Sequence, residues 1–168
     1  YRIPEMHKEA RDQFRKELLM LGFGAWQNGV WLSPNDRSQA VLDLARAHQL
    51  ETFVNIFVAQ RFGQQSDLEV VGQVWDVEAI NGRFEGFLRA FSSQPALISP
   101  RAAFCAYVQM LHEYRKFLFV DPDLPLELQP RVWYSREAAA LFREQKLRLE
   151  PLVLEFVRAT FQTADCPV

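Results

Sequence analysis

Residues 22–34 read Gly-Phe-Gly-Ala-Trp-Gln-Asn-Gly-Val-Trp-Leu-Ser-Pro, and this stretch decides how the first part of the chain folds. Asn28 and Gly29 separate two short aromatic runs, and both residue types tolerate the positive φ of a type I′ turn. Gly22 stands where a helix would end in a left-handed residue. The stretch therefore predicts a β-hairpin that directly follows a helix.

The segments on either side of the hairpin complete an α+β pattern. Residues 5–21 place apolar side chains at helical spacing, and a second helix is expected from a Pro34-Asn35-Asp36 cap to about Gln49. Residues 52–58 are β-branched and aromatic, which is typical of a covered strand. This order matches a split β-α-β-β-α-β unit whose first strand is truncated or missing. Because that strand is central, we expect upstream residues or a partner to supply it.

From Ser66 onward the periodicity becomes helical. Asp67 can cap a short helix, and a stripe of apolar residues runs from Ile80 to Phe91. Ser99-Pro100 is a strong helix start, because a capping residue precedes a proline at the first helical position. We therefore expect two domains, over residues 1–63 and 64–168, of which the second is all helical.

Prolines predict the connections of the second domain. Residues 121–130 contain three prolines, which fix φ and remove hydrogen-bond donors, so this stretch should be a stiff crossing between helices. The last helix should start at Ser135. Pro151 lies inside that helix and should kink or split it near Glu150.

The composition excludes several classes of protein. Lys and Arg number 19 and Asp and Glu 21, so the net charge of −2 leaves no basic excess to neutralise a phosphate backbone. No apolar run approaches the ~18 residues of a membrane span, and the first residues lack the order of a signal peptide, so we expect a cytoplasmic protein. The first residue is Tyr, and we expect the sequence to continue something upstream. Cys105 should be a buried thiol and Cys166 an exposed one, without a disulfide framework.

No arrangement of residues predicts an enzyme. Cys105 and His112 lie seven residues apart on a helix, and the resulting rise of ~10.5 Å is too long for a nucleophile and its base. His112-Glu113 begins like a zinc-protease motif, but Lys116 stands where the second His is needed. Gly22 and Gly24 follow a helix rather than a strand, which is the wrong context for a phosphate loop. We expect no catalytic residue, no metal and no cofactor.

Aromatic residues are the least ordinary feature, with 14 Phe, 4 Trp and 4 Tyr in the chain. Between Tyr107 and Trp133 they alternate with cationic residues, a mixture that a binding site for an anionic aromatic ligand would need. A packed helix with an exposed basic edge would give the same pattern. Both interpretations stay open at the level of sequence.

Two motifs resemble the PaaX-like family of transcriptional regulators. Residues 22–34 resemble the GFG…GVW-S-P signature of the family's middle domain, which is ferredoxin-like and similar to the Cas2 fold. Residues 112–117, 121–130 and Trp133 resemble the YR-F…DP-LP-ELLP…W run of its C-terminal domain. Gln129 replaces a usual Leu, and Tyr134-Ser135 replaces a usual Pro-Gly, so the turn into the last helix should differ. The resemblance implies an α+β chain with a ferredoxin-like sheet, its first strand truncated or missing, followed by an all-helical domain.

The resemblance also implies a function. Such regulators are homodimers that repress phenylacetic (aromatic) acid catabolism and leave DNA when an aryl-acetyl-CoA such as phenylacetyl-CoA binds. They read DNA through an N-terminal winged helix that is absent from this chain, which would leave effector sensing and dimerisation to the residues present. By chemistry and position, we assign Tyr114 and Trp133 to the aryl group, and we assign the cations to the thioester or phosphate, namely His112, Arg115 and Arg131.

Two alternatives share the same fold. A Cas2-like metal-dependent nuclease would need a carboxylate at the end of the truncated first strand, but Tyr1 to Pro4 follow it and the first acid is Glu5. A divalent metal therefore has no evident anchor there. A ligand-free dimerisation module would differ only in binding no small molecule.

Overall fold

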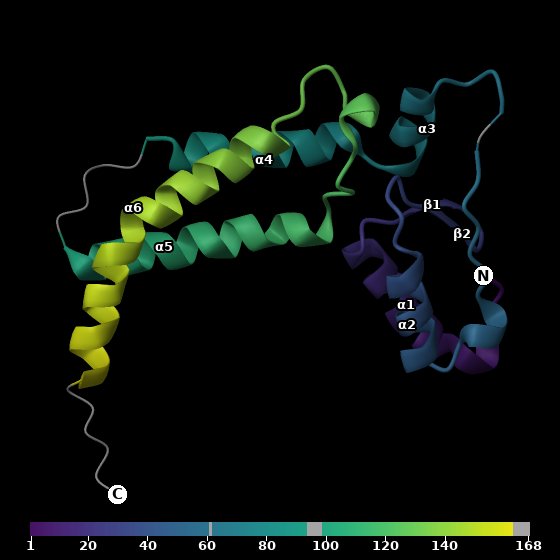
Figure 1. The fold of residues 1–168 in the computed structure, drawn as a ribbon, viewed down its shortest axis with the longest axis horizontal. Coiled ribbons are helices and arrows are strands. Elements are labelled where there is room, and N and C mark those ends of the chain that lie inside the picture. Colours follow the sequence, from purple (N-terminus) through teal and green to yellow (C-terminus); the bar gives the residue numbers. More distant parts are fainter. Residues whose placement is uncertain (61, 94–98, 163–168) are drawn as a thin grey trace, which may run out of the picture. The chain divides into compact units, whose positions relative to one another are not determined.

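The computed structural model describes residues 1–168 except 61, 94–98 and 163–168 (Figure 1). The described residues form a mixed α/β structure that is mostly helical, with a single two-stranded sheet. Two compact units are present, the first over Tyr1–Ile80 and Leu118–Val132 and the second over Asn81–Phe117 and Trp133–Val168. The domain boundary predicted between residues 63 and 64 stays a prediction.

The helices and the hairpin follow the predicted order. They are α1 (Lys8–Met20), β1 (Gly24–Gln27), β2 (Val30–Leu32), α2 (Ser38–Ala47), α3 (Asp67–Val74), α4 (Val77–Phe91), α5 (Pro100–Tyr114) and α6 (Ser135–Gln162), with short 3-10 turns at Glu5–His7, Glu51–Phe53, Arg115–Phe119 and Leu126–Leu128.

The predicted β-hairpin is confirmed, but its turn differs from the prediction. β1 and β2 pair antiparallel, with Gly24 opposite Leu32. Of the two turn residues only Gly29 has a positive φ, +77°, so the turn is not type I′, which needs two such residues. The register is irregular between Ala25 and Gln27, because the residue between them has no partner on β2. Such a bulge increases the local twist of the hairpin, which the turn does not supply.

The first unit has its core between the hairpin and two helices. Phe14 and Leu18 of α1 are buried, because they lie four residues apart and so share one face of the helix. They belong to one cluster with Val41 and Ala45, which share a face of α2 in the same way. Ile3 joins this cluster, so the residues before α1 are part of the core.

The strand predicted over residues 52–58 is wrong. Glu51–Phe53 is a 3-10 turn, and among the described residues none of 54–60 makes a backbone hydrogen bond. Their side chains nevertheless alternate as in a strand, since Val54 and Ile56 pack against the core while Asn55 and Phe57 are exposed. The segment is extended but has no neighbouring strand to pair with.

The predicted ferredoxin-like sheet is therefore not confirmed. Only Tyr1–Ile3 occupies the place between the hairpin and the 54–60 segment where a central first strand would run. There the amide of Arg2 donates to the carbonyl oxygen of Phe53 at 3.1 Å, and the amine of Tyr1 donates to the carbonyl oxygen of Gly29. Three residues are too few to bridge both edges into one sheet, because a strand usually needs about five or six.

The second unit consists of helices packed on an aromatic core. α5 and α6 lie along each other, and the buried side chains of α5 are Ala103 and Met110. Leu111 of the same helix is 41 % exposed. Cys105 is also exposed, which corrects the predicted buried thiol, because it lies two residues from Ala103 and so on another face. Cys166 lies outside the described residues.

Two local predictions about the helices are refined. Ser66, rather than Asp67, caps α3, since its hydroxyl accepts from the amide of Glu69 and the Glu69 carboxylate accepts from the amide of Ser66. α6 continues through Pro151 without splitting and changes direction along its length (Figure 1).

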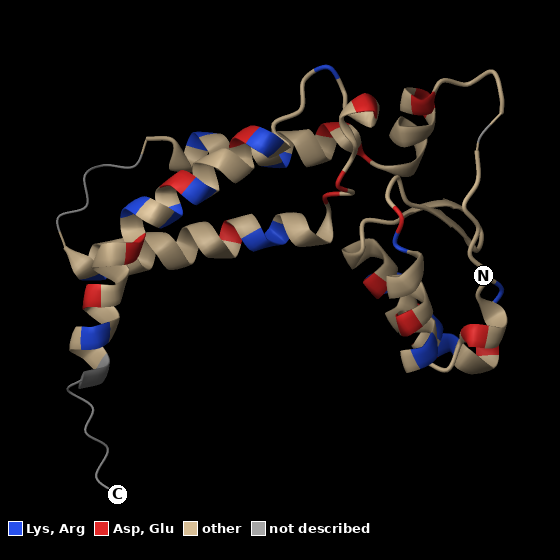
Figure 2. Ribbon diagram, viewed as in Figure 1, with Lys and Arg blue, Asp and Glu red and all other residues tan. Residues whose placement is uncertain are grey.

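Charges are mixed on the helical unit. Acidic and basic residues are interspersed along α6 (Figure 2), as expected for the solvated face of a helix. Within the part of the chain that the structure describes, no helix combines the length and apolar character needed to cross a bilayer.

Candidate functional site

The two aromatic residues assigned to an aryl ligand lie in one aromatic cluster of the second unit. Tyr114 stacks on Phe142 of α6, with ring centroids 3.9 Å apart and planes at 11°. Phe117 lies 5.6 Å from Tyr114 and 4.4 Å from Phe84, which in turn meets Trp133 edge-on at 5.5 Å. The structure thus links Tyr114 to Trp133 through two phenylalanines. Trp133 is buried and Tyr114 is half-buried, so neighbouring rings cover much of both side chains.

The three cations assigned to the ligand lie outside this cluster. His112 and Arg115 are exposed at the end of α5, on either side of Tyr114 in the sequence. Arg131 is exposed and belongs to the first unit. The ligand-binding roles of the five residues stay a prediction.

A buried polar group beside the aromatic cluster was missed by the sequence interpretation. Gln145 is only 6 % exposed and lies three residues after Phe142, on the buried face of α6. Its Oε1 has no hydrogen-bond partner among the described residues. A buried acceptor without a partner costs about 1–3 kcal/mol, so this oxygen is a candidate for contact with a ligand donor. The sequence interpretation missed Gln145 because it lies in the charged run 143–148, a pattern that is typical of a solvated helix face.

The first unit contains a groove of about 780 Å³. One edge is formed by residues 30–35, which include β2, and the other by the extended residues 54–59. Phe14, Leu18 and Val41, all buried, form its floor. None of the five predicted ligand residues lines this groove.

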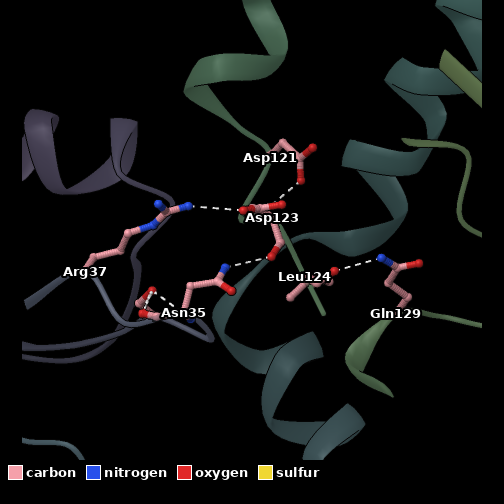
Figure 3. A network of polar contacts seen from close by, with 7 residues as sticks. Asn35, Arg37, Asp121, Asp123, Leu124 and Gln129 are labelled. Carbon is pink, nitrogen blue, oxygen red and sulfur yellow. Dashed lines mark hydrogen bonds and ion pairs between the residues drawn. The ribbon is translucent and has the colours of Figure 1, made fainter. Parts of the chain in front are cut away.

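A polar cluster that includes two of the residues lining the groove holds the proline-rich crossing in place (Figure 3). We call Asn35, Arg37 and Asp123 the clasp. The side-chain amide of Asn35 donates to the carbonyl oxygen of Asp123 at 2.8 Å, and Arg37 Nη2 lies 3.1 Å from Asp123 Oδ2. The amide of Asp123 donates to Asp121 Oδ1 at 2.9 Å, and Asp123 has a φ of +55°.

The surroundings of the clasp fix the crossing further. Burial raises the pKa of the Asp121 carboxyl above its usual range. Gln129, which departs from the family pattern, donates to the carbonyl oxygen of Leu124 at 2.7 Å and so closes the crossing on itself. The sequence interpretation missed the clasp, because its residues lie more than 80 positions apart and neither side is unusual alone.

The two signature glycines are close-packing positions as well as turns. A Cβ on Gly22 would lie 3.2 Å from the carbonyl oxygen of Pro122, and Gly22 has a φ of +85°. A Cβ on Gly24 would overlap Val74 and come within 2.8 Å of the Trp75 indole. The hairpin motif therefore packs directly against the crossing motif and the end of α3.

The acid named for the nuclease alternative is engaged in an ion pair. Glu5 Oε2 lies 2.9 Å from Arg11 Nη1. In the described part of the chain, no three His, Cys, Asp or Glu side chains are grouped so that they could hold a metal ion.

The comparisons with known proteins agree with the two motifs. Residues 1–71 match the model of the PaaX protein central Cas2-like domain, and residues 75–159 match that of the PaaX-like protein C-terminal domain. The chain is 26 % identical over 169 residues to the transcriptional repressor PaaX of Escherichia coli (strain K12), a match that covers 95 % of this chain and 54 % of that protein. The chain thus spans about half the length of the curated relative it matches. Since the C-terminal model alone spans half of the chain and the central model covers the residues before it, the chain belongs to the PaaX family.

Proposed function

We propose that this chain is the effector-sensing and dimerisation region of a transcriptional repressor of phenylacetic (aromatic) acid catabolism. The effector would be an aryl-acetyl-CoA such as phenylacetyl-CoA, and its binding would release the repressor from DNA. The proposal assigns DNA contact to a winged helix outside this chain. A net charge of −2 supports that division, because a DNA-binding surface needs a basic excess.

The observation that carries the proposal is the way the crossing joins the two units. The crossing lies within residues 118–132, which are covalently flanked by Phe117 and Trp133, and both of these belong to the aromatic cluster. Its middle is held on the first unit by Asp123 in the clasp. A ligand that displaces the rings of the aromatic cluster would therefore also displace the ends of the crossing, whose middle is held by the clasp. Coupling of ~1–3 kcal/mol through such a segment is enough to change DNA affinity several-fold to a hundredfold.

The aromatic cluster supplies the chemistry for an aryl group. Tyr114 and Trp133 offer the aryl-binding rings, and Gln145 Oε1 offers a buried acceptor that an amide N–H of the CoA arm would satisfy. His112, Arg115 and Arg131 would meet the thioester or the phosphates. Because Phe142 covers one face of Tyr114, binding requires that ring to move, and this movement is the proposed start of the signal.

Thermal unfolding of this chain with a panel of ligands tests the proposal. Phenylacetyl-CoA at ~100 times its dissociation constant should stabilise the chain by about 2.7 kcal/mol, which is a rise in Tm of roughly 5 to 10 °C. Acetyl-CoA and free CoA should give smaller rises, since they lack the aryl group. No response to any aryl thioester would refute effector sensing by this chain and favour the ligand-free dimerisation module.

A pair of variants separates specific binding from general charge effects. Arg115→Ala should reduce the rise in Tm with phenylacetyl-CoA, because it removes a cation proposed to meet the ligand. Arg83→Ala removes an exposed cation of α4 with no assigned role, and it should leave the rise unchanged. Equal effects of the two substitutions would refute the assignment of Arg115.

A further inference from the structure

Gln145 is an exception among the buried side chains of the second unit. Within the residues that the structure describes, it is the one polar or charged side chain that is buried, with 6 % of its surface exposed. Ala138, Phe142 and Leu149 share its face of α6, because they lie seven, three and four residues from it. None of these three side chains has a hydrogen-bond donor. The Gln145 amide therefore lies on an otherwise apolar stripe of the helix.

A glutamine at this position is unfavourable for the folded chain alone. Its Oε1 is buried and has no hydrogen-bond partner among the described residues. Folding therefore removes water from this oxygen without replacing the hydrogen bond that is lost. An unbranched apolar side chain such as Met would occupy similar space without this cost. Residues that break a packing rule in this way are typical of functional sites.

The position of Gln145 limits which ligand donor can reach it. Phe142, which stacks on Tyr114, lies three residues earlier on α6, a rise of ~4.5 Å along the helix. A donor that meets Oε1 while an aryl group lies among these rings must therefore be close to that group. In an aryl-acetyl-CoA the first N–H after the thioester is that of the cysteamine amide. The second amide of the arm and every group of the nucleotide are farther from the aryl ring.

We propose that Gln145 makes the site specific for aryl-acetyl thioesters of a cysteamine amide. In the bound state the N–H of this amide donates to Oε1, and the nucleotide is not needed for the contact. The minimal ligand is therefore the aryl-acetyl thioester of N-acetylcysteamine. This inference rests on the proposed effector site, and it adds the residue and the ligand atom that select the arm.

The unpaired oxygen discriminates between ligands for a physical reason. A ligand with an N–H at this place restores the hydrogen bond that folding removed. A ligand with an ester oxygen there brings a second acceptor toward Oε1 and leaves both oxygens unpaired. A site that is built around a hydrogen bond rejects an analogue without the donor more strongly than an apolar pocket rejects a missing methylene.

Calorimetric titration with two truncated thioesters tests this role. The first is the phenylacetyl thioester of N-acetylcysteamine, and the second is that of 2-acetoxyethanethiol, in which an oxygen replaces the N–H. The parent chain should bind the first at least about tenfold more tightly than the second. In Gln145→Met the two affinities should agree within about twofold, because the acceptor that separates the two ligands is gone.

The same substitution should stabilise the chain in the absence of ligand. Gln145→Met should raise Tm by about 2–4 °C or more, since it removes a buried acceptor that has no partner. Gln109→Met is the matched control, because Gln109 is exposed on α5, and it should change neither Tm nor the preference for the amide thioester. A purely structural Gln145 would give the opposite result, namely a lower Tm and equal weakening of both thioesters.

Failure of this role can be distinguished from failure of the effector site. If phenylacetyl-CoA binds but the parent chain binds the two truncated thioesters equally, or binds neither, Gln145 does not select the arm and the effector site stands. If neither phenylacetyl-CoA nor a truncated thioester binds, the effector site is refuted and the role of Gln145 with it. A Gln145→Met chain that keeps the tenfold preference would overturn the assignment to this residue.

Discussion

At the residue scale, Asp123 combines a left-handed backbone with the contacts of the clasp. Its φ of +55° is unfavourable for most residues, although Asp and Asn tolerate it better than others. Its carboxylate is 76 % exposed, so its pair with Arg37 contributes at most about 1 kcal/mol in water. The free energy of unfolding should therefore depend more on how well residue 123 tolerates the positive φ, and on the Asn35 contact, than on the ion pair.

Substitutions at Asp123 separate these contributions. Asp123→Ala should destabilise the chain by about 1–2 kcal/mol, because Ala has the full left-handed penalty and lacks the carboxylate. Asp123→Gly should be less destabilising, since Gly adopts a positive φ freely. Urea unfolding measures both free energies. Equal stability of the two variants would show that the backbone conformation is not the main contribution.

The carboxyl of Asp121, next to the clasp, makes the stability of the folded chain depend on pH, and the sign of this dependence can be derived. Burial raises the pKa of its carboxyl in the folded chain above the ordinary value of 3.8, so folding favours the protonated form. The stability that this group contributes is complete below that ordinary value and is lost as pH rises through the raised pKa.

Asp121→Asn should therefore stabilise the chain at pH 7 relative to the parent. Asn stays neutral, and its side-chain oxygen can still accept from the amide of Asp123. The gain should shrink as pH falls toward 3.8, where the parent carboxyl is also protonated. Unfolding free energies of both proteins between pH 3 and 7 test this, and a variant that is less stable at pH 7 would contradict it.

At the element scale, the sequence predicted where helices and the hairpin form better than it predicted which segments pair as strands. The hairpin and the helices follow from turn residues, caps and periodicity, which act within a few positions. Residues 54–57 are extended with strand-like alternation, yet they form no strand, because pairing depends on what lies beside them. The clasp and the buried Gln145 depend on contacts across the fold, and no local pattern revealed them.

The signature glycines give a prediction at this scale. Gly24→Ala should destabilise the first unit by about 1–3 kcal/mol, because the added Cβ would overlap Val74 and the Trp75 indole. Gly72→Ala is the matched control, since a Cβ there meets nothing within 4 Å and Ala favours the helix by up to about 1 kcal/mol. Thermal unfolding of both variants is the measurement. A stable Gly24→Ala protein would mean that α3 does not pack on β1 this closely.

At the scale of the whole molecule, the dimerisation that we propose should use exposed apolar residues of the helical unit. Leu147 and Leu154 lie seven residues apart on α6, hence on one face, and they are 70 % and 46 % exposed. Large exposed apolar side chains on one helix face are typical of an interface.

Leu147→Gln should shift the chain from dimer to monomer, because it places a polar amide in that interface. Lys146→Gln introduces the same residue at the neighbouring exposed position, and it should leave the dimer intact. Sedimentation velocity over a range of concentrations measures the change. A parent chain that is monomeric throughout would contradict dimerisation by these residues.

The most direct measurement is a calorimetric titration of this chain with phenylacetyl-CoA, with free CoA and phenylacetate as separate controls. We predict saturable binding of the thioester that is at least about tenfold tighter than that of either part, a difference of about 1.4 kcal/mol. Binding of all three with equal affinity, or no saturable binding of the thioester, would contradict an effector site in this part of the protein.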